Sequence, residues 1–438
     1  MLLPSRAEKF YNGTRIQGLK SLTLPLPQNP RGKETAIKKP GYLTSITGLM
    51  FLFVLAHTGH HIVSSLLTPL LPFIRNDFNL TYTQAGWLVS AFNLAYGIGN
   101  LPAGWLADRI GPRLVLTIGV AGVALAGLFV GLSPNLILLT VFLVLMGIAG
   151  GGYHPSAAPL VSTSAKPQNR GRALGFHQIG GSVSFFVAPL IAAGIASALG
   201  WRGTFIAVAV PTLAFGIVFY LLLGRLQGIS PANNTSDIKP TTASSQNKKL
   251  PNQCHLRRLI TVLAMGIASM VLIYSTTSFI PLFIVDNYGI SEEAAAATIA
   301  LYFSGGLWAG PLGGYLSDRW GKVPVILVVG LIGSPAVFLL NIAPFGVALS
   351  AVLIILGMAQ HLSMPVVESY IISYCPKNRR STVLGIYYFG SRGGPGVMAP
   401  AIGYLMDLYG FYAAFLAVAV ALAAITVICI ALLWGSRD

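Results

Sequence analysis

The sequence predicts an all-α integral membrane protein with 12 transmembrane helices, in two six-helix halves related by a parallel pseudo-repeat. Three observations predict this class: few charged residues, apolar runs that recur along the chain, and a motif that occurs twice. Of 438 residues, 54% are hydrophobic and 9% are charged, whereas soluble domains carry about 25% charged residues. The apolar runs are each about 20 residues long, the length that crosses a hydrocarbon core. The solvent for most of this chain is therefore lipid.

The apolar runs, divided at Gly, Pro and charged residues, place six helices in each half. The first six are expected over residues 45–72, 83–107, 113–132, 136–164, 172–199 and 202–223. The second six are expected over residues 259–285, 294–317, 323–343, 346–374, 382–407 and 410–434. The expected domains are a basic tail over 1–43, a first half over 44–224, a polar linker over 225–258, a second half over 259–434 and a short tail over 435–438.

The basic residues fall on one side of the membrane once the helices are placed. Of the 28 Lys and Arg residues, the exceptions are Arg75 and Arg202 on the other side and Arg392 within a span. Loops rich in Lys and Arg stay in the cytoplasm, so both termini and the linker are expected there, in a plasma (inner) membrane. The net charge of +16 thus reflects topology rather than nucleic-acid binding. The N-terminal tail is interpreted as cytoplasmic, with an organelle transit peptide as the alternative.

One segment of the first half returns in the second half. Gly104 to Gly111 reads GWLADRIG, and Gly314 to Gly321 reads GYLSDRWG, a shift of 210 residues. Duplication in the same direction around a central loop is the sequence form of a parallel repeat. The substrate is then expected near the middle of the membrane, between the two halves.

Both segments resemble the loop signature Gly-x-Leu-x-Asp-Arg-x-Gly-basic of major facilitator superfamily transporters. The resemblance covers residues 45–434 and implies that the motif is a conformational gate, whose Asp and Arg side chains latch neighbouring helices in one state. Glu368, near the cytoplasmic end of the tenth helix, is expected to pair with Arg319, and a proton-coupling carboxylate is the alternative. The expected gate residues are Gly104, Asp108, Arg109, Gly111, Arg113, Gly314, Asp318, Arg319, Gly321, Lys322 and Glu368.

Two further segments are loosely similar to the fosmidomycin-resistance branch of that superfamily, which exports drugs. They are GGGYHP, from Gly150 to Pro155, and FHQIGG, from Phe176 to Gly181. This similarity favours export as the direction of transport.

Six of the seven histidines fall within predicted spans, where ionisable groups are functional candidates. His57 and His61 are four residues apart and share one face of the first helix. A neutral imidazole can carry a proton or donate a hydrogen bond to a substrate, and interhelical hydrogen bonding is the alternative. The pair also resembles a metal chelate, but no carboxylate stands beside it on that helix, so no metal or other cofactor is expected. The proton-coupling candidates are His57, His60, His61, His154, His177 and His361.

Arg392 lies about ten residues into the eleventh helix, near the middle of the membrane at about 1.5 Å per residue. A charge there cannot face lipid without a large cost. We expect it to bind an anionic group of the substrate, with a protein counterion as the alternative. Polar side chains on other spans can add hydrogen bonds, although helix packing explains them equally well. The expected substrate-binding residues are Arg392, His57, His61, Asn93, Gln178 and Tyr387.

These features predict a secondary transporter of a small organic molecule, with anionic cargo favoured by Arg392. Proton-coupled efflux by alternating access is the first hypothesis, and an uptake symporter or facilitator for an organic anion or metabolite is the alternative. The chain has no Walker A sequence for ATP-driven transport. It also has no HExxH or GxSxG pattern, so a histidine-dependent membrane enzyme is a remote alternative. The expected partners are the substrate, protons and the lipid bilayer, and the expected state is a monomer.

Overall fold

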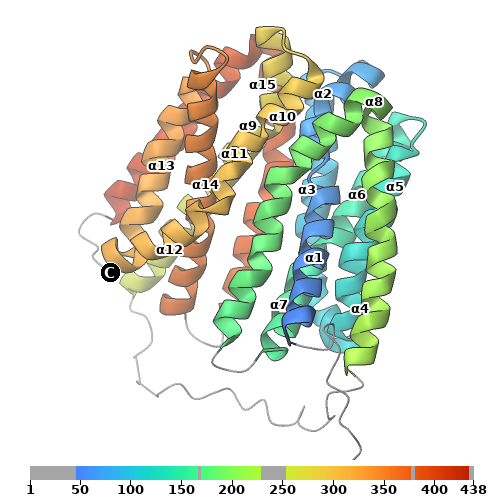
Figure 1. Ribbon diagram of the computed structural model, residues 1–438. Coiled ribbons are helices and arrows are strands. Elements are labelled where there is room, and N and C mark those ends of the chain that lie inside the picture. Colours follow the sequence, from blue (N-terminus) through green and yellow to red (C-terminus); the bar gives the residue numbers. More distant parts are fainter. Residues whose placement is uncertain (1–45, 166–168, 228–252, 376–379, 434–438) are drawn as a thin grey trace, which may run out of the picture. The chain divides into compact units, whose positions relative to one another are not determined.

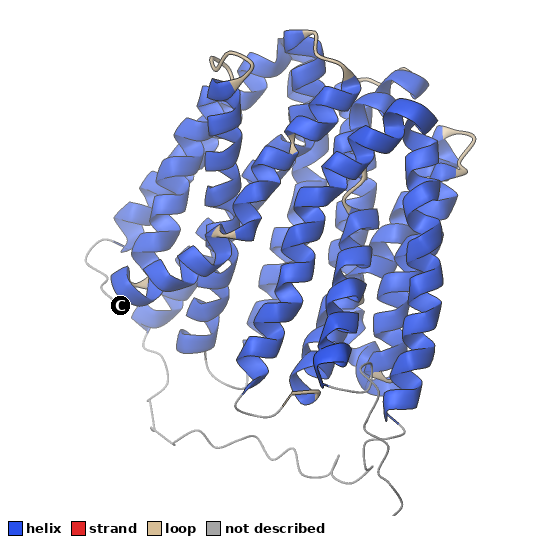
Figure 2. Ribbon diagram, viewed as in Figure 1, coloured by secondary structure: helices blue, strands red, loops and turns tan. Residues whose placement is uncertain are grey.

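The computed structural model describes residues 46–165, 169–227, 253–375 and 380–433 (Figure 1). Over these residues every regular element is a helix and no strand occurs (Figure 2), which confirms the all-α class. Eight helical stretches in this part of the chain are long and apolar enough to cross a membrane. Two of these stretches span 54 and 51 residues, more than twice the length of about 20 residues that one crossing needs.

Each of the two long stretches contains a glycine at which the chain turns back. Gly200 has a φ of 65° and Gly410 a φ of 79°, and neither residue has helical backbone angles. Glycine adopts positive φ at little cost because it has no Cβ. Each stretch therefore supplies two spans, so the eight stretches give ten. The helix Tyr82–Ile110 and the helical segment from Glu292 to Trp320 occupy the two remaining expected positions, consistent with the twelve expected helices.

The first half follows the expected order of helices, with breaks in the first and fourth and a π-helical turn in the third. The first expected helix divides near Ser65 and continues to Phe78, and the fourth divides at Gly152. In both places a proline, Pro69 or Pro155, lacks the N–H that would bond the carbonyl four residues earlier. The elements are α1 (Ile46–Ser64), α2 (Leu67–Phe78), α3 (Tyr82–Ile110), α4 (Pro112–Thr117), the π-helical η2 (Ile118–Gly122), α5 (Val123–Gly131), α6 (Leu136–Gly151), α7 (Tyr153–Thr163) and α8 (Arg170–Gln227).

The second half also follows the expected order. Its eighth expected helix is interrupted by a 3₁₀ turn at Gly305–Leu307, where Pro311 cannot bond the Leu307 carbonyl. The helices α8 and α9 extend into the expected linker from both sides; its residues 228–252 and both expected tails lie outside the described residues. The elements are α9 (Gln253–Tyr288), α10 (Glu292–Thr298), α11 (Ala300–Ser304), η4 (Gly305–Leu307), α12 (Ala309–Trp320), α13 (Lys322–Leu339), α14 (Val347–Tyr374) and α15 (Arg380–Leu433).

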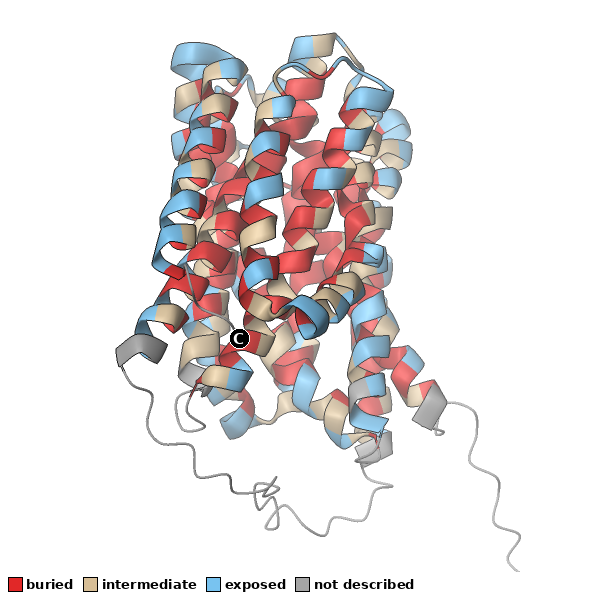
Figure 3. Cartoon of the chain, turned by 90° about the vertical axis from the view of Figure 1, so that its left-hand side faces the viewer, coloured by how far each residue is buried: buried red, intermediate tan, exposed pale blue. Residues whose placement is uncertain are grey.

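Apolar side chains occupy both the interior and the outward faces of the helices. Figure 3 shows buried residues between the helices and exposed residues facing outward. Large apolar side chains such as Ile137, Leu221 and Val420 are more than half exposed. An outward apolar surface of this kind suits contact with lipid chains rather than water.

The helix ends define two ends of the bundle, which differ in charge. At one end α3 meets α4 and α12 meets α13, and we call it the basic end because it carries Arg109, Arg113, Arg319 and Lys322. At the opposite end, which we call the far end, α2 meets α3 and α9 meets α10.

The two halves meet along α3 and the first part of α15. A Cβ added to Gly97 would lie 2.7 Å from the Gly393 Cα, and one added to Gly86 would lie 2.8 Å from the Ala399 carbonyl oxygen. Both distances are too short for any side chain, so glycine is required for this approach. Nearer the basic end, by contrast, a Cβ on Gly104 would meet no atom within 4 Å. The halves are therefore in close contact from the middle to the far end and diverge toward the basic end.

Candidate transport site

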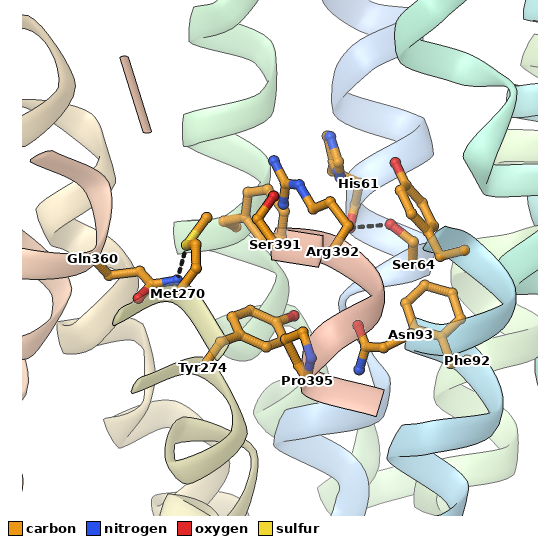
Figure 4. A pocket seen from close by; sticks show the side chains of 12 residues that line it. His61, Ser64, Phe92, Asn93, Met270, Tyr274, Gln360, Ser391, Arg392 and Pro395 are labelled. Atoms are coloured by element: carbon orange, nitrogen blue, oxygen red, sulfur yellow. Dashed lines mark hydrogen bonds between the residues drawn. The ribbon is translucent and has the colours of Figure 1, made fainter. Parts of the chain in front are cut away.

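A pocket lies between the two halves, midway along the helices. Each half contributes six lining residues. They are His61, Ser64, Phe92, Asn93, Tyr96 and Phe185 from the first half, and Met270, Tyr274, Gln360, Ser391, Arg392 and Pro395 from the second. Figure 4 shows Ser391 and Arg392 between the Met270 and Gln360 side of the pocket and the His61 and Ser64 side.

Glycines on α15 determine which way Arg392 faces. Gly390 and Gly394 pack directly on the side chains of Ile267 and Val271 of α9, while Gly393 faces Gly97 of α3. These two faces of α15 are closed by neighbouring helices. The remaining face carries Ser391, Arg392 and Pro395 into the pocket.

The Arg392 guanidinium has no carboxylate partner among the described residues. Its Nη2 atom donates to the Met364 Sδ atom at 3.5 Å, and a thioether sulfur is a weak acceptor. The two ion pairs of the described chain, Arg75 with Asp286 and Arg202 with Asp77, both lie at the far end. Among the described residues, the pocket therefore contains a guanidinium without a directly paired carboxylate, although Glu368 is near enough to interact with it electrostatically.

Uncharged polar groups surround this charge. The Asn93 Nδ2 atom donates to the Val89 carbonyl at 3.0 Å, which leaves its amide oxygen available. The Gln360 Nε2 atom donates to the Met270 sulfur, and its buried Oε1 atom has no partner. Phe92 and Phe185 add apolar walls. The lining therefore combines one positive charge, hydrogen-bond acceptors and apolar walls.

Five of the six candidate histidines meet in the first half. The Nδ1 atom of His57 lies 2.8 Å from the His177 carbonyl oxygen, and that of His60 lies 2.7 Å from the Gly119 carbonyl oxygen. The Nε2 atoms of His61 and His154 are 3.2 Å apart. Among these rings only His61 lines the pocket.

His361, the sixth candidate, lies apart from this cluster in the second half. Its Nδ1 atom lies 2.8 Å from the carbonyl oxygen of Gly357 on the same helix, α14, and the ring packs against Gly306. The proton-coupling role of all six histidines stays a prediction.

The structure brings three of the six expected substrate-binding residues to the pocket and places three elsewhere. His61, Asn93 and Arg392 line it. His57 lies behind His61 and is buried, and Gln178 is exposed on α8. Tyr387 is buried in an apolar cluster and its hydroxyl has no partner. Sequence reasoning placed these three on the right spans, but the helical face that each side chain occupies depends on packing between helices.

Sequence reasoning also missed some lining residues. Ser64 follows His61 by three residues and so shares its helical face, a signal that was available. Phe185 and Met270 carry no such signal, since an apolar side chain on a membrane helix is the ordinary case.

The two copies of the gate motif adopt the same backbone at the basic end. Gly111 and Gly321 have φ values of 91° and 89°, so both copies turn at a residue that must be glycine. Arg109 lies over the Trp105 ring, with its Cζ atom 4.3 Å from the centroid. Arg113 donates to the Tyr220 carbonyl at 2.6 Å. These contacts all lie within the first half.

The expected latches of the gate are not formed in this conformation. Asp108 and Asp318 are exposed, and neither forms an ion pair among the described residues. Arg319 donates to the Tyr315 hydroxyl at 3.2 Å, while the buried Oε1 atom of Glu368 has no hydrogen-bond partner among the described residues. An open basic end is the state in which such latches would be released. Their formation in the opposite state stays a prediction.

At the far end, polar side chains join the two halves. Arg75 donates to both carboxylate oxygens of Asp286, at 2.5 and 2.8 Å, and the Tyr82 hydroxyl donates to the same carboxylate at 2.6 Å. The Asp407 carboxylate accepts from the backbone N–H groups of Tyr82 at 2.9 Å and Thr83 at 2.8 Å, and from the Thr83 hydroxyl. We call Arg75, Tyr82, Thr83, Asp286 and Asp407 the far-end latch.

Sequence reasoning did not single out this latch. One signal in the sequence was available. Acidic residues at the far end are few, so each of them can pair with only a few partners. A further contact across the halves links Asn76 to Glu292. Partial burial raises the pKa of the Glu292 carboxyl, and the hydrogen bond from Asn76 opposes that shift.

The fold and the two-half site agree with the comparison to known proteins. The chain matches the family model described as the Major Facilitator Superfamily over residues 53–291 and 262–438. The chain belongs to the major facilitator superfamily. It is therefore a multi-pass membrane transporter and not an enzyme.

Relatives within the major facilitator superfamily handle varied cargo. The chain is 33% identical over 205 residues to a probable L-galactonate transporter of Escherichia coli strain K12. The matched region covers 46% of this chain and 44% of that protein. It is 25% identical over 374 residues to a probable sulfoacetate transporter of Cupriavidus necator. This match covers 78% of this chain and 83% of that protein.

A solved structure shares the fold. It is a bacterial homolog of the human lysosomal transporter Spinster, in an inward-facing and unoccupied conformation, with a TM-score of 0.72 and 18% identity over 88% of this chain and 96% of that one.

Proposed function

We propose that this superfamily member transports a small organic anion and that Arg392 binds the anionic group. The observation that carries the proposal is the guanidinium in a pocket between the halves, with only a thioether as its hydrogen-bond partner. An unpaired charge within a membrane is costly, so a ligand that supplies the missing negative charge binds favourably. A carboxylate, sulfonate or phosphate can accept two parallel hydrogen bonds from the planar guanidinium.

The remaining lining residues narrow the cargo. The free amide oxygens of Asn93 and Gln360 accept hydrogen bonds, so they favour hydroxyl groups on the cargo. L-galactonate and sulfoacetate, which name the two relatives above, are both organic anions, and this supports the same class of cargo.

Alternating access supplies the mechanism. The far-end latch closes one end, and the divergence of α3 and α15 opens the other. Rocking one half against the other would break the latch and bring the glycines of the gate motif together. Because basic loops stay in the cytoplasm, we propose that the basic end is cytoplasmic and that this is the cytoplasm-open state.

We propose that a proton gradient drives transport and that the direction is export, as the sequence similarity favours. Flux of a labelled organic acid in proteoliposomes tests both points. Export by exchange predicts that the anion moves against an imposed proton gradient, in the direction opposite to protons. Movement together with protons would instead show uptake symport, and no response to the gradient would show facilitated diffusion.

The binding role of Arg392 is tested by substitution. Truncating one partner of a buried charge pair costs about 2–5 kcal/mol, so Arg392→Ala should weaken binding of an anionic substrate about 30-fold or more. Arg392→Lys retains the charge but loses the planar guanidinium that donates two parallel hydrogen bonds. Its affinity should therefore lie between those of Arg392→Ala and the wild-type protein. Arg257→Ala is the matched control, because Arg257 is exposed near the basic end and does not line the pocket.

Substrates are found by thermal-shift screening of organic acids with the wild-type protein, and affinities are then measured by isothermal titration calorimetry. If Arg392→Ala binds the anion as tightly as the wild-type protein does, Arg392 is a structural counterion and the proposal fails.

A further inference from the structure

Three imidazole rings converge beside the pocket. The ligating nitrogens of His57, His61 and His154 all lie within 4.8 Å of one another. The sequence places only His57 and His61 on one helix, and two imidazoles with no neighbouring carboxylate argued against a metal. The fold changes that argument, because α7 brings His154 against α1 as a third ligand.

We propose that His57, His61 and His154 form a binding site for a divalent transition-metal ion of the Zn²⁺ and Co²⁺ class. Three neutral imidazoles plus one open position make up a known type of zinc coordination. Imidazole is also a preferred ligand of the other later first-row divalent ions. The proposal concerns a cation site in the first half and does not depend on the identity of the transported molecule.

The hydrogen bond of His57 leaves its second ring nitrogen available to bind a metal. Its Nδ1 atom lies 2.8 Å from the His177 carbonyl oxygen, which can only accept, so Nδ1 carries the hydrogen. The Nε2 atom therefore holds a lone pair, and it is buried without a hydrogen-bond partner in the described part of the chain. Metal-binding histidines commonly donate their second ring nitrogen to a carbonyl in this way. A buried acceptor without a donor costs free energy that a bound cation would recover.

The spacing of the other two rings suits a metal. Tetrahedral Zn²⁺ with Zn–N bonds of about 2.0–2.1 Å places its ligand nitrogens about 3.3 Å apart. The Nε2 atoms of His61 and His154 are 3.2 Å apart. One of them donates to the other in the metal-free protein, and moving that hydrogen to Nδ1 of the same ring would leave both lone pairs facing the metal.

Neighbouring groups hold the site and leave one side open. Tyr153 stacks on His57 with ring centroids 5.2 Å apart, and His60 is engaged by Gly119 and Tyr96 and so is not a fourth ligand. His61 lines the pocket, so the histidine trio adjoins that space. Arg392 lines the same pocket, and its positive charge opposes that of a dication. Removing this charge should therefore strengthen metal binding.

The experiment uses the full-length protein in detergent, stripped with a chelator and carrying no histidine tag. Co²⁺ is the spectroscopic probe, and equilibrium dialysis with Zn²⁺ gives the stoichiometry and affinity. We expect one ion per chain, with the strong visible absorption of four-coordinate rather than six-coordinate Co²⁺. Loss of supporting groups around a metal typically weakens affinity 10–100-fold, so His57→Ala and His154→Ala should each weaken binding by about tenfold or more.

Two further variants make the assignment specific. His361→Ala is the matched control, because it removes an imidazole of the second half that lies outside the trio, and its affinity should equal that of the wild-type protein. Arg392→Gln should bind the metal more tightly than the wild-type protein. Weaker binding in Arg392→Gln would contradict the site, since an arginine cannot be one of its ligands.

The proposal is overturned if the wild-type protein shows no saturable binding of one ion, or if binding is unchanged in both ligand variants. Where an alanine variant is not monodisperse, His154→Gln keeps the side-chain volume and removes the ligand. A six-coordinate Co²⁺ spectrum of the wild-type protein would also overturn it. These measurements use no organic anion, so failure of the transport proposal would not affect them.

Discussion

Asp407 provides a direct test of the idea that the far-end latch holds one end of the transporter closed. Its carboxylate, on α15 of the second half, accepts from the first two backbone N–H groups of α3, in the first half. Those N–H groups have no partner within their own helix. Asp407 therefore acts as a helix cap supplied by the other half, and the cap exists only while the far end is closed. Removing it should favour the open far end.

The size of the effect follows from capping energetics. Loss of a capping side chain costs about 0.5–2 kcal/mol, and a negative charge at a helix N-terminus adds about 0.3–1 kcal/mol. Because Asp407 is exposed, solvent screening places the sum near about 1.5 kcal/mol. That free energy corresponds to about a tenfold change in the ratio of the two states, so a far-open population of about 1% would rise to about 10%.

Distance measurements between spin labels can detect this shift. In a background without Cys254, Cys375 and Cys429, one pair of labels at Leu132 and Val347 reports on the far end, since both residues are exposed there. A second pair at Ile110 and Trp320 reports on the basic end. In Asp407→Ala the first distance distribution should gain a longer component and the second a shorter one.

Asp77→Ala is the matched control for this prediction. Asp77 forms an ion pair with Arg202 at 2.6 Å, at the same end and with similar exposure, but both residues belong to the first half. The control should leave both distance distributions unchanged. If Asp407→Ala also leaves them unchanged, or if Asp77→Ala shifts them equally, the latch does not set the balance between states.

Two further predictions concern the basic end. Asp108→Asn and Asp318→Asn should slow transport, measured as flux in proteoliposomes. The substrate affinity measured by calorimetry should change less than about threefold, because a gate acts on the exchange between states. A selective loss of affinity would refute this prediction. Glu368→Gln and Arg319→Ala should each slow flux. If the two residues pair in the opposite state, their effects should be non-additive in the double variant. Additive effects would point instead to Glu368 as a proton-coupling carboxylate.

Much of the fold could be predicted from the sequence because membrane helices can be recognised by the length and apolar composition of their segments. The all-helical class, the order of the helices, the repeat and the turn glycines Gly111 and Gly321 follow from local signals. What local signals do not fix is where a helix breaks. Pro69, Pro155 and Pro311 each interrupt a helix near their own position, yet Pro102 lies inside the unbroken helix α3. Whether a proline interrupts a helix depends on the neighbours that take up the freed carbonyl.

The pocket was predictable only in part, for a related reason. Arg392 could be identified from one sequence because a charge within a span has few permissible environments. His154 could not be placed beside His61, since α1 and α7 are far apart in the chain and only packing brings them together. The same holds for Asp407 and Tyr82, which are separated by more than 300 residues. Contacts between halves are set by complementary surfaces, which a single sequence does not display.

The repeat places corresponding residues of the two halves in two kinds of contact, one within a half and one between the halves. Asp77 and Asp286 occupy corresponding positions of the two halves, five residues after Pro72 and Pro281. Asp77 pairs within its own half, whereas Asp286 pairs with Arg75 across the interface. A rocking transporter needs both kinds of contact, because each half must stay rigid while the contacts between halves break. Equivalent positions that stabilise different interfaces satisfy that need.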